Sequence, residues 1–242
     1  GARVGDRAVR SPKFLAKTTK IIHIDVDPAE IGKNIHVDIP LVGDCGNILE
    51  QLCANADCTE RTDWLDELSQ IKNGGPTENE TQGYVNPKMF IRKLSAKLPE
   101  NTICVADVGQ NQIWTCNNFQ FKGGRFLTSG GMGTMGYSVP AAIGAKFASP
   151  DSEVVAICGD GSFQMQMMEL ATIIQEKLAV KIILMRNNRL GMVRELQTIH
   201  YSDNQTAIHI ADGNPDFVAL AKAYGIEAER VCTMAEAEQA IE

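Results

Sequence analysis

Polar and glycine residues follow three apolar runs of the sequence, at the point where each run ends. The three segments are Asp107-Val108-Gly109-Gln110-Asn111, Gly159-Asp160-Gly161-Ser162 and Arg186-Asn187-Asn188-Arg189. Short runs that are apolar throughout are typical of buried strands in a parallel sheet. Ligands of open parallel sheets bind beyond the carboxyl ends of the strands. We therefore expect the three segments to contribute to one site.

The combination of Asp160 and Asn187 indicates the chemistry of that site. Gly-Asp-Gly alone is usually a turn, but here both side chains directly follow apolar runs in consecutive strand–helix units. Carboxylate and carboxamide oxygens suit Mg²⁺ or Ca²⁺, and a site with few protein ligands leaves room for phosphate oxygens. Gly161 and Ser162 begin a helix, and the free N–H groups of a helix start favour an anion. The sequence thus predicts a metal-assisted diphosphate anchor.

A second motif supports an alternative. Residues 131–136, Gly-Met-Gly-Thr-Met-Gly, have the GxGxxG spacing of a dinucleotide-binding turn and open a helix, and Asp160 then ends the next strand. An NAD-dependent oxidoreductase is therefore the competing hypothesis. It does not explain the Gly-Asp-Gly-Ser segment or the two asparagines. A third hypothesis is a structural or regulatory module with a degenerate site, against which the intact Asp160 and Asn187 argue.

The elements that must position these residues fall into two parts separated by a linker. Residues 74–84 are rich in turn formers and lack large apolar side chains until Tyr84, which is typical of a linker. The sequence predicts an α/β fold for 85–242, a parallel sheet covered by helices on both faces. Residues 1–73 are expected to be part of a second α/β domain.

Individual elements follow from the spacing of apolar residues. Strands are expected at 20–27, 37–41, 102–106, 154–158, 180–185 and 227–231, with a weaker candidate at 126–128. Helices are expected to begin at Pro28 and after an Asp44 N-cap, and to include 61–71, 90–98, 137–147, 163–174, a segment from 190 onward, and 217–224. A helical pattern is still running where the sequence ends, so we expect a piece of a longer polypeptide.

Composition excludes several classes of protein. The 242 residues carry a formal net charge of -7, from 23 basic and 30 acidic side chains, which argues against a nucleic-acid partner. No apolar run reaches the roughly 18 residues that a membrane span requires. Seven cysteines without CxxC spacing are typical of the reducing cytoplasm. A cytoplasmic location with no membrane partner is therefore expected.

Together these residues resemble the thiamine-diphosphate enzymes, whose cofactor motif is Gly-Asp-Gly followed by Asn. The closer resemblance is to the acetolactate synthase (acetohydroxyacid synthase) catalytic subunit. It rests on residues 1–7, 22–27, 107–114, 129–136 and 190–193. The resemblance implies that 1–73 is the end of the central FAD-associated domain and that 85–242 is most of the thiamine-diphosphate-binding domain.

The resemblance also implies a role for each matching residue. Asp160, the side chain of Asn187 and the main-chain carbonyl of Arg189 would bind Mg²⁺. Residues around the diphosphate would be Gln110, Asn111, Gly161, Ser162, Leu190 and Gly191. Gly133, Thr134 and Met135 would hold the aminopyrimidine ring, with Met135 bending the cofactor. Met192 would line the thiazolium and substrate pocket. The family often has His at the position of Asn111.

FAD, in a structural role, is the second cofactor that the resemblance implies. The matching positions are Gly1, Ala2, Arg3, Asp25, Val26, Asp44 and Cys45. Val4-Gly5 departs from the usual Phe-Asp, and weak or absent FAD binding by these residues alone is expected. Asp6 and Arg7 match the family's substrate channel. Leu196 stands where most members have Trp, which leaves the choice between pyruvate and 2-ketobutyrate open.

The implied reaction is decarboxylation of pyruvate and condensation with a second 2-keto acid. The product is 2-acetolactate or 2-aceto-2-hydroxybutyrate, in the first common step of branched-chain amino acid synthesis. Another thiamine-diphosphate carboligase or decarboxylase is the alternative within the superfamily. The resemblance implies a homodimer or homotetramer, a possible regulatory small subunit, and an activating Glu from outside these residues. We therefore expect the 242 residues alone to be inactive.

Overall fold

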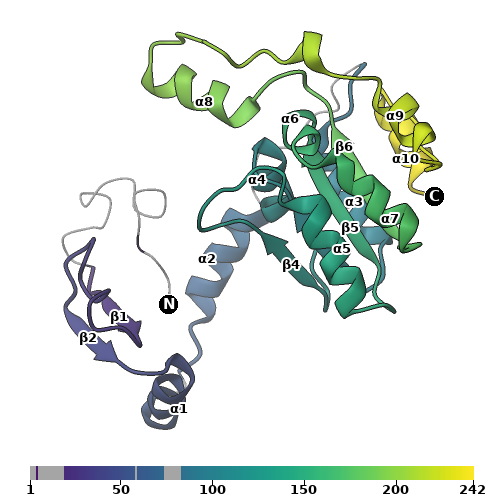
Figure 1. Cartoon of the computed structure of the whole chain (residues 1–242). Coiled ribbons are helices and arrows are strands. Elements are labelled where there is room, and N and C mark those ends of the chain that lie inside the picture. The colour runs from purple at the N-terminus through teal and green to yellow at the C-terminus, as the bar shows by residue number, and fades with distance from the viewer. Residues whose placement is uncertain (1–3, 5–18, 58, 74–82) are drawn as a thin grey trace. The chain divides into compact units, whose positions relative to one another are not determined.

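The computed structural model describes residue 4 and residues 19–57, 59–73 and 83–242. The chain divides into two compact units, Gly1–Pro76 and Thr77–Glu242. Figure 1 draws both units.

The first unit contains two parallel strands and two helices in its described part. Strand β1 (Ile22–Asp25) pairs with β2 (Ile39–Val42), and helices α1 (Cys45–Asn55) and α2 (Thr62–Asn73) follow. The expected N-cap is confirmed, because the Asp44 side chain accepts from the N–H of Asn47. The helix expected from Pro28 is wrong. Turns and bends occupy 28–35, and Gly32 has a φ of 71°, which is not helical. The few residues before Gly32 form too few hydrogen bonds to offset the free-energy cost of helix nucleation.

The second unit is built on a four-stranded parallel sheet. Its strands are β3 (Ile103–Ala106), β4 (Arg125–Thr128), β5 (Val154–Gly159) and β6 (Val180–Met185). Their spatial order is β4-β3-β5-β6, and every neighbouring pair is parallel. The chain therefore leaves β3 toward one edge of the sheet and leaves β5 toward the other. The α/β fold class predicted from the sequence is confirmed, including the weaker strand at 126–128.

Helices cover both faces of this sheet. Packing on one face involves α3 (Pro87–Lys97), α4 (Gln110–Asn118) and α10 (Met234–Ala240). The opposite face is covered by α5 (Ser138–Ala148), α6 (Asp160–Gln164), α7 (Leu170–Gln175) and α9 (Phe217–Ala223). In Figure 1, α5 and α7 lie in front of the strands and α3 lies behind them. Helix α4 thus connects β3 to β4 on one face, while α6 and α7 connect β5 to β6 on the other.

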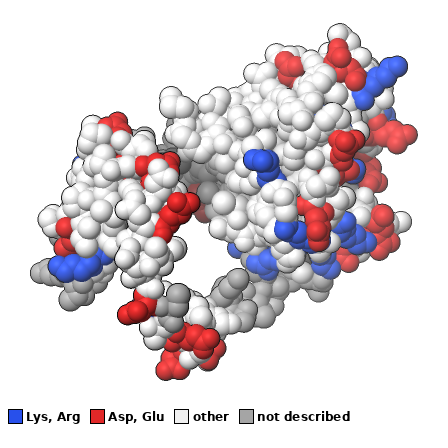
Figure 2. Space-filling view, turned by 90° about the horizontal axis from the view of Figure 1, so that it is seen from below, with Lys and Arg blue, Asp and Glu red and all other residues white. Residues whose placement is uncertain are grey.

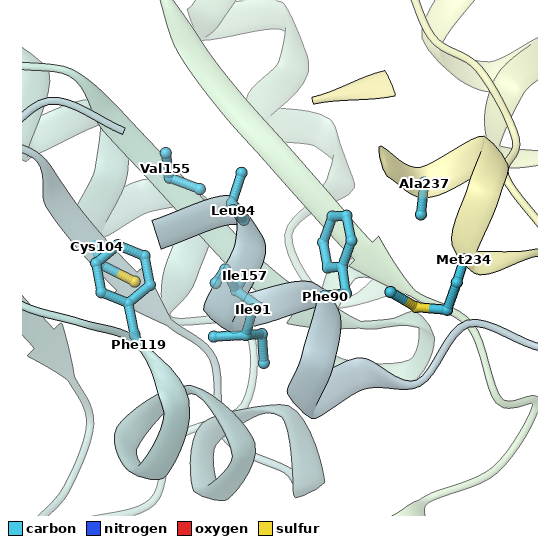
Figure 3. Packing of buried hydrophobic residues seen from close by; sticks show 9 residues of the cluster. All are labelled: Phe90, Ile91, Leu94, Cys104, Phe119, Val155, Ile157, Met234 and Ala237. Carbon is cyan, nitrogen blue, oxygen red and sulfur yellow. The ribbon is translucent and has the colours of Figure 1, made fainter. Parts of the chain in front are cut away.

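Strand β5 divides its side chains between these two layers with the period of two expected for a strand. Val155 and Ile157 pack with α3 and α10, where Figure 3 shows Phe90, Leu94 and Met234 near them. Ala156 and Cys158 contribute to the opposite layer. Because β5 is buried on both faces, its end is held firmly, which matters for the residues that follow it.

Two expected elements differ from the structure. The helix expected at 163–174 is divided into α6, a 3₁₀ turn at Met167–Glu169 and α7, because Gln166 leaves the helical conformation with φ -139°. The strand expected at 227–231 is wrong, since this exposed, charged stretch pairs with no strand in the described part of the chain. Ile226, just before this stretch, and Val231, its last residue, instead pack on two different core clusters.

Helix α8 (Gly191–His200) and a 3₁₀ turn at Ala211–Gly213 complete the second unit. On the face shown in Figure 2, acidic and basic side chains of the described residues are interspersed, without a continuous basic surface. Among the helices of the described residues, none has both the length and the apolar character needed to cross a membrane.

Candidate functional site

β3 and β5 are neighbours, and the connections after them run on opposite faces of the sheet, which is where open α/β sheets have their binding crevice. The buried Asn111 lies at the strand ends beneath this expected crevice. Its Nδ2 donates to the carbonyl of Asp107 at 2.8 Å and to that of Ile157 at 3.2 Å. The Asn111 amide thereby joins the two strand ends, and its donors are directed into the protein.

Asp160 lies at the end of β5, beside the end of β6, because Gly159 pairs with Met185 in the parallel register. Its carboxylate is buried, with 1% of the residue exposed. Oδ2 accepts from the N–H of Asn188 at 2.7 Å and from Asn214 Nδ2 at 2.8 Å, while Oδ1 accepts from the N–H of Gly161 at 3.1 Å. An ionised carboxylate offers about four lone-pair positions, so these three bonds leave capacity on Oδ1 for a cation.

The loop after β6 is held in a defined turn. Asn188 has a φ of 58°, a left-handed conformation that Asn tolerates better than most residues. The N–H of Arg189 donates to Asn187 Oδ1 at 2.9 Å. The loop also pairs with a later segment, since the N–H of Leu190 donates to the carbonyl of Ile208 and the N–H of Ile210 to that of Asn188. The N–H of Asn188, the residue after Asn187, donates to Asp160 and joins this turn to the end of β5.

Gly191 brings two of the expected site residues together. A Cβ atom at Gly191 would lie 2.0 Å from Gln110 Oε1 and 2.9 Å from Asn187 Nδ2. Gln110 begins α4 after β3, and its Nε2 also lies 3.4 Å from Glu195 Oε2 on α8. The ends of β3 and β6 therefore meet at a position where only glycine leaves room.

Gly161 gathers the apolar part of the site. A Cβ atom there would lie 2.9 Å from Leu190, 3.2 Å from Ile210 and 3.7 Å from the Met135 methyl group. Met135 belongs to the Gly-rich loop 129–137 between β4 and α5. Four segments that are far apart in the sequence thus converge around two glycines.

The GxGxxG segment occupies this loop and does not form the tight turn of a dinucleotide site. Its residues are held by Ser129, whose carbonyl accepts from Gly133 and whose Oγ accepts from the N–H of Thr134 at 3.0 Å. The N–H groups of Gly136 and Ser138 donate to the Asp107 carboxylate at 2.9 and 2.8 Å. These donors are already used inside the protein, so the NAD-dependent alternative is not favoured.

Three other expected site residues are not among the side chains that meet at Gly161 and Gly191. The Ser162 hydroxyl is paired with Gly159 at the start of α6, which is only five residues long. Met192 lies half-buried in the first turn of α8, and Leu196 on the same helix is 52% exposed. The cofactor and substrate roles expected for these three residues stay predictions.

The residues expected to contact FAD belong to the first unit. Asp25 is buried and accepts from the N–H of Asp27, and this hydrogen bond holds the pKa of the Asp25 carboxyl below its ordinary value. Asp44 caps α1, Cys45 begins that helix, and Val26 is exposed. Gly1, Ala2 and Arg3, together with the substrate candidates Asp6 and Arg7, lie outside the described residues.

Asn214 is a site residue that the sequence reasoning missed. Its Nδ2 donates to Asp160 Oδ2 and, at 2.9 Å, to Asn188 Oδ1, while its Oδ1 accepts from Gln164 Nε2 at 2.7 Å. Arg186 Nε donates to the same Asn188 oxygen at 2.8 Å. The only local signal is the Asn-Pro-Asp sequence at 214–216, which reads as the cap of α9.

Cys158 lies behind the strand ends and is fully buried. Burial raises the pKa of the Cys158 thiol well above its ordinary value, and the charge of Asp107 raises it further. Burial likewise raises the pKa of Cys104 to about 12. Both thiols therefore remain neutral and serve as packing groups.

The donor set around Asp160 suits a small hard cation with an anionic partner. Asp160 supplies a buried carboxylate with spare capacity, and the N–H of Asn188 joins it to the turn that carries the Asn187 carboxamide oxygen and the main-chain carbonyl of Arg189. A Cβ atom at Gly161 or Gly191 would collide with Leu190 or Gln110, so only glycine lets these segments pack so closely. The oxygen donors of these residues fit Mg²⁺.

The chain matches two protein-family models. Residues 107–242 match "Thiamine pyrophosphate enzyme, C-terminal TPP binding domain", and residues 1–52 match "Thiamine pyrophosphate enzyme, central domain". The first match begins at Asp107 and includes every segment that converges on Gly161 and Gly191.

Curated relatives extend this similarity. The chain is 43% identical over 242 residues to the probable acetolactate synthase large subunit of Methanocaldococcus jannaschii, with 96% of this chain and 41% of the relative covered. It is 40% identical over 253 residues to the acetolactate synthase large subunit of Corynebacterium glutamicum, with 100% and 40% covered. The chain thus spans about two fifths of the length of these relatives. From the family match and the crevice geometry, we conclude that the chain belongs to the thiamine pyrophosphate enzyme family.

Proposed function

We propose that this chain is part of the catalytic subunit of an acetolactate synthase. The enzyme decarboxylates pyruvate and condenses the remaining two-carbon unit with a second 2-keto acid. The products are 2-acetolactate or 2-aceto-2-hydroxybutyrate, in the first common step of branched-chain amino acid synthesis. The relatives named acetolactate synthase, about 40% identical over most of this chain, support this reaction.

One observation supports the cofactor site above all others. The N–H of Asn188 donates to Asp160 Oδ2 at 2.7 Å, which joins the expected ligand Asp160 to the turn between the expected ligands Asn187 and Arg189. Asp160, Asn187 and the Arg189 carbonyl hold the cation, and Gln110, Gly161 and Gly191 border the diphosphate. The chemistry that thiamine diphosphate supplies when bound is stabilisation of the negative charge left on carbon when CO₂ departs.

The residues of this chain orient the substrate-binding part of the site and exclude water from it. Met135, Leu190 and Ile210 form an apolar surface over Gly161. Such a surface lowers the local dielectric constant and thereby strengthens the electrostatic interactions of a charged group that is bound against it. Met192 and Leu196 on α8 line the approach of the second 2-keto acid in this proposal.

The remaining parts of the proposal concern the whole protein. FAD binds with a structural role through the first unit, with contributions from Asp25, Val26, Asp44 and Cys45. The protein works as a cytoplasmic homodimer or homotetramer and can associate with a regulatory small subunit. These statements rest on the resemblance to acetolactate synthases.

The test uses the complete protein that contains this chain. With Mg²⁺ and thiamine diphosphate, we expect pyruvate to be converted to acetolactate, measured by chemical detection of the product. Calorimetric binding of thiamine diphosphate should be lost when Mg²⁺ is removed with a chelator. Binding of NAD that is indifferent to Mg²⁺, with no acetolactate formed, would refute the proposal in favour of the dinucleotide alternative.

A further inference from the structure

Asp107 is a buried carboxylate to which the proposed function assigns no role. Only 1% of the residue is exposed. Oδ1 accepts from the N–H groups of Val108 and Gly136 at 2.8 and 2.9 Å. Oδ2 accepts from the N–H and the hydroxyl of Ser138 at 2.8 and 2.7 Å. All four donors are neutral, so this charge is stabilised by hydrogen bonds alone.

Three of these donors come from a distant segment of the chain. Gly136 lies near the end of the loop 129–137, 29 residues after Asp107, and Ser138 begins α5, 31 residues after Asp107. Helix α5 has no capping side chain of its own, because its N-cap residue Tyr137 makes no such bond. Asp107 therefore supplies from another strand the acceptor that a helix start needs, and its negative charge is favourable there.

Gly136 is also held from its other side. It has a φ of 85°, and a Cβ atom there would lie 2.9 Å from Gln166 Cγ and 3.0 Å from Met165 Cβ. Thr134 is fixed by Ser129 at the start of the same loop. Met135 lies between these two fixed points, with its methyl group near Gly161.

We propose that Asp107 is a positioning residue that fixes the loop 129–137, and so the place of Met135, for binding the ring portion of thiamine diphosphate. This inference rests on the proposed function. The diphosphate portion binds at Asp160 and Asn187, on other loops, and at Gln110, which is not among the partners of the Asp107 carboxylate. Asp107 therefore affects affinity for the complete cofactor more than affinity for its diphosphate end.

The experiment compares two ligands in the complete protein, thiamine diphosphate and inorganic pyrophosphate, each with Mg²⁺. Asp107→Ala leaves three buried N–H donors without an acceptor, and we expect roughly 10-fold or greater loss of thiamine diphosphate affinity. Pyrophosphate affinity should stay within about twofold of the unaltered protein. Asp107→Asn keeps one acceptor oxygen and should have an intermediate effect. Ser138→Ala removes only the hydroxyl bond and should have the smallest effect.

A second measurement does not depend on any ligand. In the unligated protein, amide hydrogen exchange at Gly136 and Ser138 should accelerate in Asp107→Asn and Asp107→Ala, and exchange at Ile157 should not change. If Asp107→Ala does not fold, the Asn and Ser138 variants still carry the test.

The possible results separate the two proposals. Equal losses for both ligands would show a general structural role and would overturn the inference, as would unchanged thiamine diphosphate affinity in Asp107→Asn and Asp107→Ala. In either case the unaltered protein still binds thiamine diphosphate, so the proposed function stands. Failure of the unaltered protein to bind thiamine diphosphate with Mg²⁺ would overturn both.

Discussion

Two buried aspartates follow neighbouring strands of the same sheet, and their surroundings differ. Asp107 after β3 accepts four hydrogen bonds, three of them from the loop 129–137 and the start of α5. Asp160 after β5 accepts three, and two of these converge on Oδ2. Each carboxylate is 1% exposed. Burial alone therefore does not distinguish a carboxylate whose hydrogen bonds are all made within the protein from one that can also bind an ion.

The number and direction of donors make the distinction. A carboxylate whose oxygens are both fully used is committed to the protein, whereas one with spare capacity on one oxygen can accept a cation. Cys158 is fully buried on β5, and burial raises the pKa of its thiol, which the charges of Asp107 and Asp160 raise further.

Asp160→Asn should weaken Mg²⁺-dependent binding of thiamine diphosphate most. It removes the charge that faces the cation, so the loss should exceed the roughly 10–100-fold typical of changing an outer-shell partner. Calorimetry with the complete protein measures it. Asp151→Asn, at an exposed position before β5, is the control and should bind normally. Normal binding by Asp160→Asn would remove the distinction between the two aspartates.

Asn214→Ala should weaken the same binding by roughly 10–100-fold, because the amide orients the Asp160 carboxylate through Oδ2. Titration of Mg²⁺ at fixed thiamine diphosphate measures the change. Asn101→Ala is the matched control, since its amide is exposed and lies 3.5 Å from the carbonyl of Asp151 at the opposite end of the sheet. Equal behaviour of the two variants would show that Asn214 does not act on the site.

Gly191→Ala should reduce thiamine diphosphate affinity by roughly 10-fold, because the new methyl group displaces the Gln110 side chain. Gln110 is flexible, so the free energy of unfolding should change little. Gly144→Ala within α5 is the control, because a Cβ atom there contacts nothing within 4 Å. That variant should keep its affinity and gain about 0.5–1 kcal/mol of stability. A Gly191→Ala protein with full affinity would show that the contact of Gln110 is not needed.

The buried thiols predict how stability depends on pH. An unfolded thiol ionises near its ordinary value of 9.0, whereas the folded Cys104 does so only at about 12. The unfolded chain thus loses the proton first, and stability falls between pH 9 and pH 12 by about 1.4 kcal/mol per pH unit for each such thiol. Urea unfolding at several pH values measures this slope.

Cys104→Ala should reduce the slope, and Cys116→Ala, at an exposed position, should not. In Asp107→Asn the pKa of Cys158 should move back toward its ordinary value, because one of the nearby charges is gone. An unchanged slope in Cys104→Ala would contradict the pKa shift.

The sequence predicts those parts of the structure that depend on neighbours along the chain. The apolar runs of β3, β5 and β6 and the Asp44 cap are local patterns, and they are confirmed. The segment at 227–231, also expected to be a strand, lacks a partner strand in the described chain, and pairing is not a local property. The break at Gln166 falls where the distant Gly136 packs against it.

The same limit applies to the site. Asp160 and Asn187 follow their strands directly, so their place at one sheet edge could be predicted from the order of the elements. Asn214 reaches Asp160 across 54 residues, and Asp107 reaches Gly136 across 29. Such contacts depend on how loops fold back over the sheet, which neither periodicity nor motif spacing specifies.

The opposite courses of the chain after β3 and β5 have an evolutionary consequence. The two loops that border the crevice diverge as they leave the sheet. An insertion in one of them can grow outward without displacing the other, since the amide of Asn111 keeps the strand ends joined beneath. A change in the length of one loop therefore leaves the residues at the other strand end in place.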